Sequence, residues 1–437
     1  MKRFASFLLL LLATPLFGQT LDQRIDRDLA SFVETYQSLH AAPELSTQEA
    51  KTSAFVAQRL CDLGWTVTYP FGKYEDPKLT CYGVVAVMKN GAGPTVLVRS
   101  DMDALPVIEQ TGLPYASTVK TKNATGEEVG VMHACGHDLH MTTLLGTAKM
   151  LADLRKQWHG TVILVGQPAE EVVLGANGIL HAGLYEQFGK PNYAIAMHDW
   201  SSLEAGKIGW CPGFFMSNSD SVNLTIRGVG GHGASPQSTK DPVIVAAQTV
   251  LALQTIVSRE TSPLDPVVVT VGSIHGGAKR NVIPDEVKLL LTVRTYKPEV
   301  RKRVLASIER VARGVATAAG MPDDRMPIFE YVQSEAADAT YNDPALTERL
   351  AKALEGALGA ANVVRIDPAM VSEDFGRFGV NGQVPTALLA LGAVDPAKIA
   401  SGERLPSLHS SRFAPLPEPS IRTGVKAMTS MVLDLLK

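Results

Sequence analysis

Short apolar runs alternate with amphipathic segments along the first half of the chain. Four runs are almost continuously hydrophobic, as in strands buried on both faces: 84–88, 95–99, 161–167 and 193–197. Apolar positions with helical spacing predict helices at 21–39, 47–63, 141–154 and 177–184. This alternation is typical of an α/β fold with a mixed, mostly parallel, doubly wound sheet.

The pattern changes after residue 213. Strands at 221–227, 267–272 and 287–296 and helices at 242–259 and 299–319 predict a small two-layer α+β unit of ferredoxin-like type. Alternating α/β elements then return at 344–358, 363–366, 387–391 and 420–436. We therefore expect a catalytic domain formed by residues 20–213 and 327–437, interrupted by an inserted lid domain at 214–326.

The N-terminus predicts export. Two basic residues precede an apolar run at 4–12 and small or turn-forming residues up to Gly18, as in a secretory signal peptide over residues 1–19. The run is too short for a comfortable membrane span, although an uncleaved anchor is the alternative. No later segment supplies about 20 uninterrupted apolar residues, so we expect a periplasmic or secreted protein without stable membrane insertion.

Composition narrows the class of partner. The chain has 437 residues, enough for two domains, and a net charge of −3, which argues against nucleic acid as a partner. Four cysteines are too few for a disulfide scaffold. Cys61 and Cys81 could pair in an oxidising compartment or could be two separate buried thiols, and the sequence leaves both alternatives open.

Residues 133–140 contain three histidines, one cysteine and one aspartate. Such side chains are costly to bury without a partner. Cys135 could be a nucleophile with a histidine base, or Cys135 and His137 could be ligands of a transition metal. Other polar groups directly follow predicted strands, where α/β sheets bind ligands: Asp101, Asp103, Glu170, Glu171 and His198. His409 lies in a loop before the last helix.

Several motifs carry a family resemblance that spans nearly the whole mature chain. The most specific are Cys-Gly-His-Asp at 135–138 and Pro-Ala-Glu-Glu at 168–171. Other matching segments are 39–46, 99–106, 131–134, 230–234, 281–284, 372–375 and 409–410. With these motifs the chain resembles the amidohydrolase branch (subfamily D) of metallopeptidase family M20, which includes hippurate hydrolases, aminoacylase-like enzymes and auxin–amino acid conjugate hydrolases.

The resemblance implies two divalent metal ions per subunit, Mn, Zn or Co, and hydrolysis of N-acyl amino acids or related amides by a metal-activated water. The implied general base is Glu170, and Asp101 would be an orienting carboxylate. The implied metal ligands are Cys135, His137, Glu171, His198 and His409. A metallo-carboxypeptidase or dipeptidase acting on short peptides is the alternative. A cysteine hydrolase would leave most of these residues without a purpose.

The resemblance also gives roles to the inserted unit. His232 would stabilise the oxyanion, often across a homodimer formed by the lid, while Asn281 and Arg294 would hold the substrate carboxylate. One departure from the family is Gln237, where many members of this branch have histidine.

Four residues near the metal motif have predicted supporting roles. Arg99 cannot bind a metal because it stays protonated, so we expect it to pair with Asp101 or Asp103. We expect His133 and His140 to support the site rather than bind metal directly. Asp138 would orient a ligand or cap the following helix.

Overall fold

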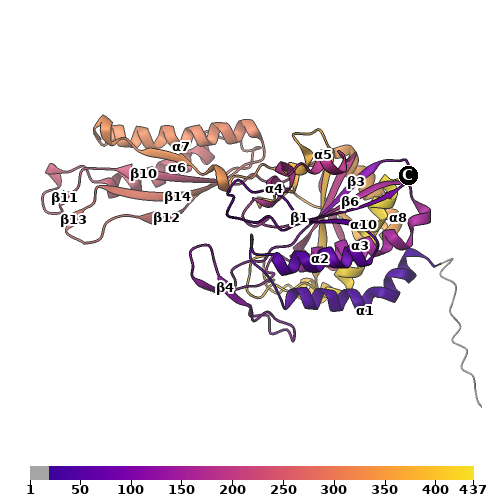
Figure 1. Ribbon diagram of the computed structural model, residues 1–437. Coiled ribbons are helices and arrows are strands. Elements are labelled where there is room, and N and C mark those ends of the chain that lie inside the picture. Colours follow the sequence, from indigo (N-terminus) through magenta and orange to yellow (C-terminus); the bar gives the residue numbers. More distant parts are fainter. Residues whose placement is uncertain (1–18) are drawn as a thin grey trace, which may run out of the picture.

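A computed structural model describes residues 19–437 of the protein. The predicted signal peptide, apart from its last residue, lies outside the described residues. Figure 1 shows a broad α/β body and a long lid that extends from one side of it.

The body is built on an eight-stranded sheet. Its central neighbours β6, β3, β7 and β18 pair in parallel, while β1, β2 and β8 form antiparallel pairs. The strands in spatial order are β1 (Thr66–Phe71), β2 (Gly83–Asn90), β6 (Gly160–Gln167), β3 (Thr95–Asp101), β7 (Tyr193–Glu204), β18 (Thr386–Val394), β8 (Ile208–Trp210) and β17 (Val363–Arg365). The predicted mixed, mostly parallel α/β class is therefore confirmed.

Helices cover both faces of this sheet. One face packs against α1 (Leu21–His40), α2 (Ala50–Asp62), α3 (His137–Asp153), α8 (Pro344–Leu358) and α10 (Pro417–Leu435). The other face packs against α4 (Gly175–His181) and α5 (Leu184–Phe188). The short helix α9 (Pro396–Ser401) follows β18.

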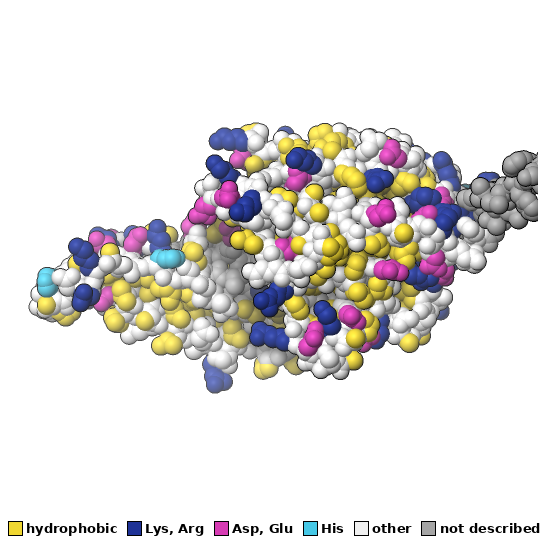
Figure 2. All heavy atoms as spheres, turned by 90° about the horizontal axis from the view of Figure 1, so that it is seen from below, with side chains coloured by type: hydrophobic (Ala, Val, Ile, Leu, Met, Phe, Trp, Pro, Cys, Tyr) yellow, Lys and Arg dark blue, Asp and Glu magenta, His cyan; other side chains and the backbone are white. Residues whose placement is uncertain are grey.

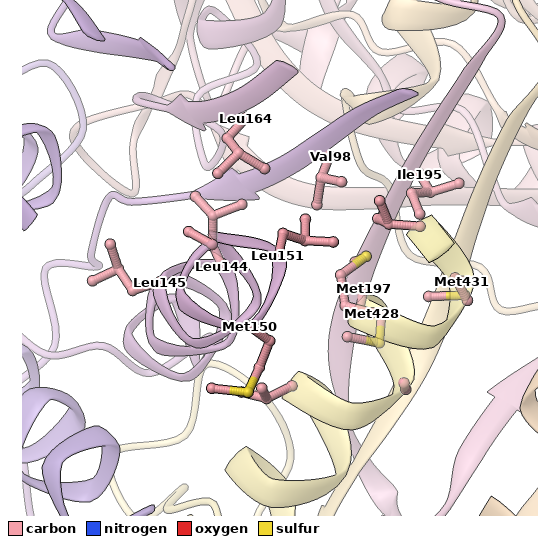
Figure 3. Packing of buried hydrophobic residues seen from close by; sticks show 14 of the residues in the cluster. Val98, Leu144, Leu145, Met150, Leu151, Leu164, Ile195, Met197, Met428 and Met431 are labelled. Atoms are coloured by element: carbon pink, nitrogen blue, oxygen red, sulfur yellow. The ribbon is translucent and has the colours of Figure 1, made fainter. Parts of the chain in front are cut away.

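The central strands are almost continuously apolar because both of their faces are buried. In β2, Val84 and Ala86 join one hydrophobic cluster while Val85 joins the other. Figure 3 shows the first of these clusters, where Leu151 of α3 lies between β3 and α10.

The lid is a four-stranded antiparallel sheet with α6 (Pro242–Arg259) and α7 (Pro298–Ala318) packed on it. Its strand order is β12 (Val268–His275), β14 (Glu286–Arg294), β10 (Asp220–Arg227) and β15 (Ile328–Tyr331). β15 lies just beyond the predicted lid boundary at residue 326 and pairs with β10. A small pair, β11 (Gly231–His232) and β13 (Val282–Ile283), lies at the end of the lid farthest from the body (Figure 1).

Three local features differ from the sequence-based expectations. α3 begins at His137 rather than at residue 141. Strand β1 and the hairpin of β4 (Lys120–Lys122) and β5 (Glu128–Gly130) were not predicted. β9 (Gly213–Met216) and β16 (Thr340–Asn342) form a further pair. Cys61 and Cys81 are both free thiols in this structure.

Candidate metal centre

The predicted site residues gather at one edge of the large sheet. β3 ends at Asp101, β6 ends three residues before Glu170, and β7 carries His198. Because these strands are parallel, their carboxyl ends lie at the same edge. The loop before α3 brings Cys135 to this edge, and the backbone N–H of His409 donates to the carbonyl of the neighbouring Ala134 at 2.8 Å.

All five predicted metal ligands lie close together. Sγ of Cys135 is 3.2 Å from Nε2 of His409 and 3.6 Å from Nε2 of His198. Glu171 lies between two groups, with Oε2 3.5 Å from Nε2 of His409 and Oε1 3.8 Å from Nε2 of His137. Two groups of possible ligands share Glu171, one with Cys135 and His409 and one with His137 and Glu170, while His198 gathers with Asp101, His137 and His140.

The donor atoms fit divalent cations. Both ring nitrogens of His137 and Oε1 of Glu171 are buried without a well-aligned hydrogen-bond partner among residues 19–437. Buried polar atoms rarely remain unpaired, and a cation between Nε2 of His137 and Oε1 of Glu171 would satisfy both of these atoms. Nδ1 of His198 lies 2.8 Å from the carbonyl oxygen of Asp199, which leaves Nε2 facing the thiol. Thiolate, imidazole and carboxylate are typical ligands of zinc-like metals.

The electrostatics of the site also favour bound cations. Burial alone disfavours the His137 cation, but the carboxylates of Asp101, Asp103 and Glu171 raise the pKa of His137 to about 10. Burial, followed by the charge of Glu171, raises the pKa of the Cys135 thiol well above its usual value. The site is therefore rich in negative charge, and a cation bound there would replace protons on these groups.

A match to one protein family shows which family the chain belongs to. Residues 97–434 match peptidase family M20/M25/M40. The chain belongs to this family. It is 32% identical over 409 residues to N-acetyldiaminopimelate deacetylase of Limosilactobacillus fermentum, covering 92% of this chain and 96% of that protein. It is 36% identical over 349 residues to hippurate hydrolase of Campylobacter jejuni, covering 79% and 84%.

A solved structure agrees with this assignment. The crystal structure of the YXEP protein of Bacillus subtilis, described as a dinuclear metal-binding peptidase of the M20 family, superposes with a TM-score of 0.74. The two proteins are 27% identical, and the match covers 94% of this chain and 99% of that one. The resemblance found in the sequence is thus confirmed.

In this M20 protein, Glu170 is buried beside the ligand set. Burial, and then the neighbouring Glu373 and Glu171 carboxylates, raise the pKa of Glu170 well above its usual value, while Arg99 opposes the shift. The preceding Ala169 has a φ of +51°, a left-handed conformation that is strained for a residue with a side chain. The turn that carries Glu170 is therefore held by its surroundings.

Asp101 faces several partners at once. Its Oδ2 is 2.6 Å from Nη1 of Arg99 and 3.8 Å from Nε2 of His137, and its Oδ1 is 2.6 Å from Nδ1 of His140. The expected ion pair of Arg99 with Asp101 is thus present. Arg99 also binds Glu373 at 2.7 Å, a contact that sequence reasoning did not assign.

The surroundings of the other polar residues of the metal motif, His133, Asp138 and His140, differ from one another. Nε2 of His140 accepts the backbone N–H of Asp199 at 2.8 Å, which suits a supporting role. His133 is buried, and neither ring nitrogen has a hydrogen-bond partner in the described part of the chain. Asp138 is not the N-cap of α3, which is Gly136; its Oδ2 pairs with Nδ1 of His40 at 2.6 Å and its Oδ1 accepts the N–H of Leu139 at 2.9 Å.

The three lid residues do not lie together. Arg294 is at the end of β14 near the body, where Nη1 donates to Oγ of Ser372 at 2.8 Å. His232 in β11 and Asn281 before β13 are exposed at the far end of the lid (Figure 1). Within one chain, the structure does not bring His232 or Asn281 to the metal ligands.

Sequence reasoning missed the role of Asp103. This carboxylate is buried, and its Oδ1 lies 3.4 Å from Nδ1 of His137, on the ring edge opposite the one that faces Glu171. The only signal in the sequence is the position of Asp103 just after β3, because its backbone partners leave no pattern of their own.

Proposed function

We propose that this protein is a metal-dependent amidohydrolase that cleaves the amide bond of N-acyl amino acids. The observation that carries the proposal is the adjacent pair of Glu170, which is buried, and Glu171, which is half-buried, beside Nε2 of His137, a buried nitrogen without a hydrogen-bond partner among the described residues. One glutamate can bind a metal while its neighbour moves a proton. The relatives named as N-acetyldiaminopimelate deacetylase and hippurate hydrolase support this substrate class.

Each residue has a role in this proposal. Two divalent cations, Mn²⁺, Zn²⁺ or Co²⁺, held by the five donors would polarise the amide carbonyl and lower the pKa of a water molecule. Glu170 takes a proton from that water and passes it to the nitrogen of the leaving amine. The raised pKa of Glu170 suits a group that must hold the proton between these steps. Arg294 would hold the substrate carboxylate with the N–H groups that it does not use on Ser372.

We further propose that the lid forms a homodimer. β12 is an edge strand of the lid sheet, and Ile274 on it is 57% exposed. α6 exposes Ile244 and Leu251, and Figure 2 shows hydrophobic side chains gathered along the lid. α6 is long and apolar enough to cross a membrane by length and composition alone, but its inner face packs into the lid core. A second copy on this face could bring its His232 to the metal centre.

We also propose export, which rests on the basic and apolar residues at 2–12. Sequencing the N-terminus of the mature protein checks it, and an intact Met1 would contradict it.

The central test combines metal removal with one substitution. Activity on N-acyl amino acids should disappear after chelation and return with Mn²⁺, Zn²⁺ or Co²⁺. Glu170→Gln should retain two metal ions per subunit and lose about 10²- to 10⁴-fold in kcat. Glu348→Gln, at an exposed position of α8, is the matched control and should leave kcat unchanged.

Three outcomes would contradict the proposal. Glu170→Gln with nearly full activity would exclude Glu170 as the base. Activity that survives chelation but is abolished by thiol alkylation would favour Cys135 as a nucleophile. Faster turnover of short peptides than of any N-acyl amino acid would favour a peptidase.

A further inference from the structure

Asp103 contacts both halves of the proposed catalytic machinery. Its Oδ1 accepts the backbone N–H of Glu170 at 3.1 Å, and its Oδ2 accepts that of Glu171 at 3.0 Å. The hydroxyl of Ser46 donates to Oδ2 at 2.6 Å. With His137 3.4 Å from Oδ1, this one buried carboxylate joins three separate segments of the chain.

The turn that Asp103 holds is strained. Ala169 has a φ of +51° and Val173 a φ of +60°, conformations that L-residues rarely adopt. Such a turn persists only where its surroundings fix it. A second carboxylate, Glu49, contributes one bond, since its Oε1 accepts the N–H of Ala169 at 2.8 Å.

We propose that Asp103 is the positioning residue that fixes the backbone of Glu170 and Glu171 relative to His137. The inference rests on the proposed function for the roles of these three residues. Asp103 touches neither the substrate nor the reacting atoms, and it acts by accepting the two backbone N–H groups that follow Ala169. Asp101, to which the family resemblance gives an orienting role, instead has its short contacts with Arg99 and His140.

The substitution Asp103→Asn isolates this role. An asparagine side chain has nearly the same shape but offers only one acceptor oxygen, and its NH₂ group donates. Whichever way the amide points, one of the two N–H groups, of Glu170 or of Glu171, loses its acceptor and faces a donor. The hydroxyl of Ser46 can rotate to accept, so the remaining packing is preserved.

Glu49→Gln is a matched control. Oε1 of Glu49 accepts both bonds that it makes in the turn region, from Thr47 and Ala169, while Oε2 has no hydrogen-bond partner among the described residues. A glutamine keeps one carbonyl oxygen in place of Oε1. This variant therefore removes a carboxylate next to the same turn without removing an acceptor.

The decisive measurement is hydrogen–deuterium exchange of the full mature protein, as purified and after chelation, read from overlapping peptides across residues 167–174. Asp103→Asn should speed exchange of the Glu170 or Glu171 amide by about tenfold or more. The Glu49→Gln protein and peptides outside the turn should exchange as in the wild type. Because chelated protein shows the effect, the readout does not depend on catalysis.

Metal binding and kinetics give a second readout. Asp103→Asn should weaken Mn²⁺ binding by about 10- to 100-fold, the usual range for a partner of a metal-ligating histidine. At saturating Mn²⁺, kcat should remain lowered while KM changes little, since the base and not the substrate contact is displaced.

Unchanged exchange at Glu170 and Glu171 would overturn the inference, as would an equal increase over the whole protein. If Asp103→Asn does not fold, Ser46→Ala decides, because it removes the hydroxyl that anchors Oδ2 and should speed exchange at the same amides. Wild-type exchange in that variant would then refute the inference. A fully active Glu170→Gln protein would instead refute the proposed function and leave the exchange result standing.

Discussion

Arg99→Met tests how strongly a buried cation stabilises the body of the protein. The side chain of Arg99 is fully buried and donates to Asp101 at 2.6 Å and to Gln167 at 2.9 Å. It donates twice to Glu373, at 3.1 Å and 2.7 Å, and once to Asp374 at 3.3 Å. Methionine fills a similar volume and leaves all three carboxylates without this cation.

The magnitude follows from the fate of those carboxylates. Removing one partner of a buried ion pair costs about 3 to 5 kcal/mol, and each hydrogen bond to a charged group contributes about 1.5 to 3 kcal/mol. The full sum is not reached because a carboxylate can take up a proton. Burial already raises the pKa of Asp374 to about 7, even against the opposing charge of Arg99. We therefore expect a loss of about 3 to 5 kcal/mol at pH 7.

Calorimetry of the chelated protein measures this loss. For a chain of this size it corresponds to a decrease in Tm of about 3 to 6 °C. The loss in free energy of unfolding should increase from pH 6 to pH 8. In the variant the buried carboxylates must take up protons when the chain folds, and this uptake becomes less favourable as the pH rises. Arg313→Met is the control, since Arg313 is half exposed and its only ion pair among residues 19–437 is with Glu309 on its own helix, at 3.1 Å. A loss no larger than that of the control, or under about 1 kcal/mol, would refute the reasoning.

Two further predictions concern other parts of the structure. Burial disfavours the His40 cation, but hydrogen bonds to Asp138 and Glu109 raise the pKa of His40 to about 10. The stabilisation by the His40 cation should be complete below about pH 6.5 and lost as the pH rises towards 10. Over this range the free energy of unfolding in urea should therefore decrease by about 3 to 5 kcal/mol more for the wild type than for His40→Gln. Parallel pH profiles would contradict this. At the lid, Leu251→Glu should convert a homodimer into monomers in sedimentation velocity, because Leu251 on α6 is 73% exposed. An unchanged dimer would exclude this face.

Much of the fold could be predicted because its strands and helices have clean periodicity. The helix predicted at 242–259 matches α6, and the strand predicted at 161–167 differs from β6 by one residue. Periodicity failed where buried polar groups replace apolar ones. The start of α3 at His137 was missed because its first turn is polar, and those side chains are buried through tertiary pairing rather than by hydrophobicity.

That the candidate ligands lie close together could be predicted, but the groups that hold them could not. Cysteine and histidine in short motifs are conspicuous because they are costly to bury without a purpose. Glu373 pairs with Arg99 from a distant part of the chain, and no local sequence pattern predicts that contact. The position of His232 could not be predicted from the sequence either, because it depends on the length and direction of the whole lid.

Asp101 and Asp103 show why residue type alone did not separate two roles. They flank the fully buried Met102 at the end of β3, and both carboxylates are buried at the same edge of the sheet. Asp101 binds side chains that the motifs contain, so its importance could be inferred from them. Asp103 accepts mainly backbone N–H groups, which every residue except proline supplies. The residue types of its partners therefore do not indicate these contacts. A carboxylate that works through backbone contacts is visible only once the turn at 168–171 has been placed in space.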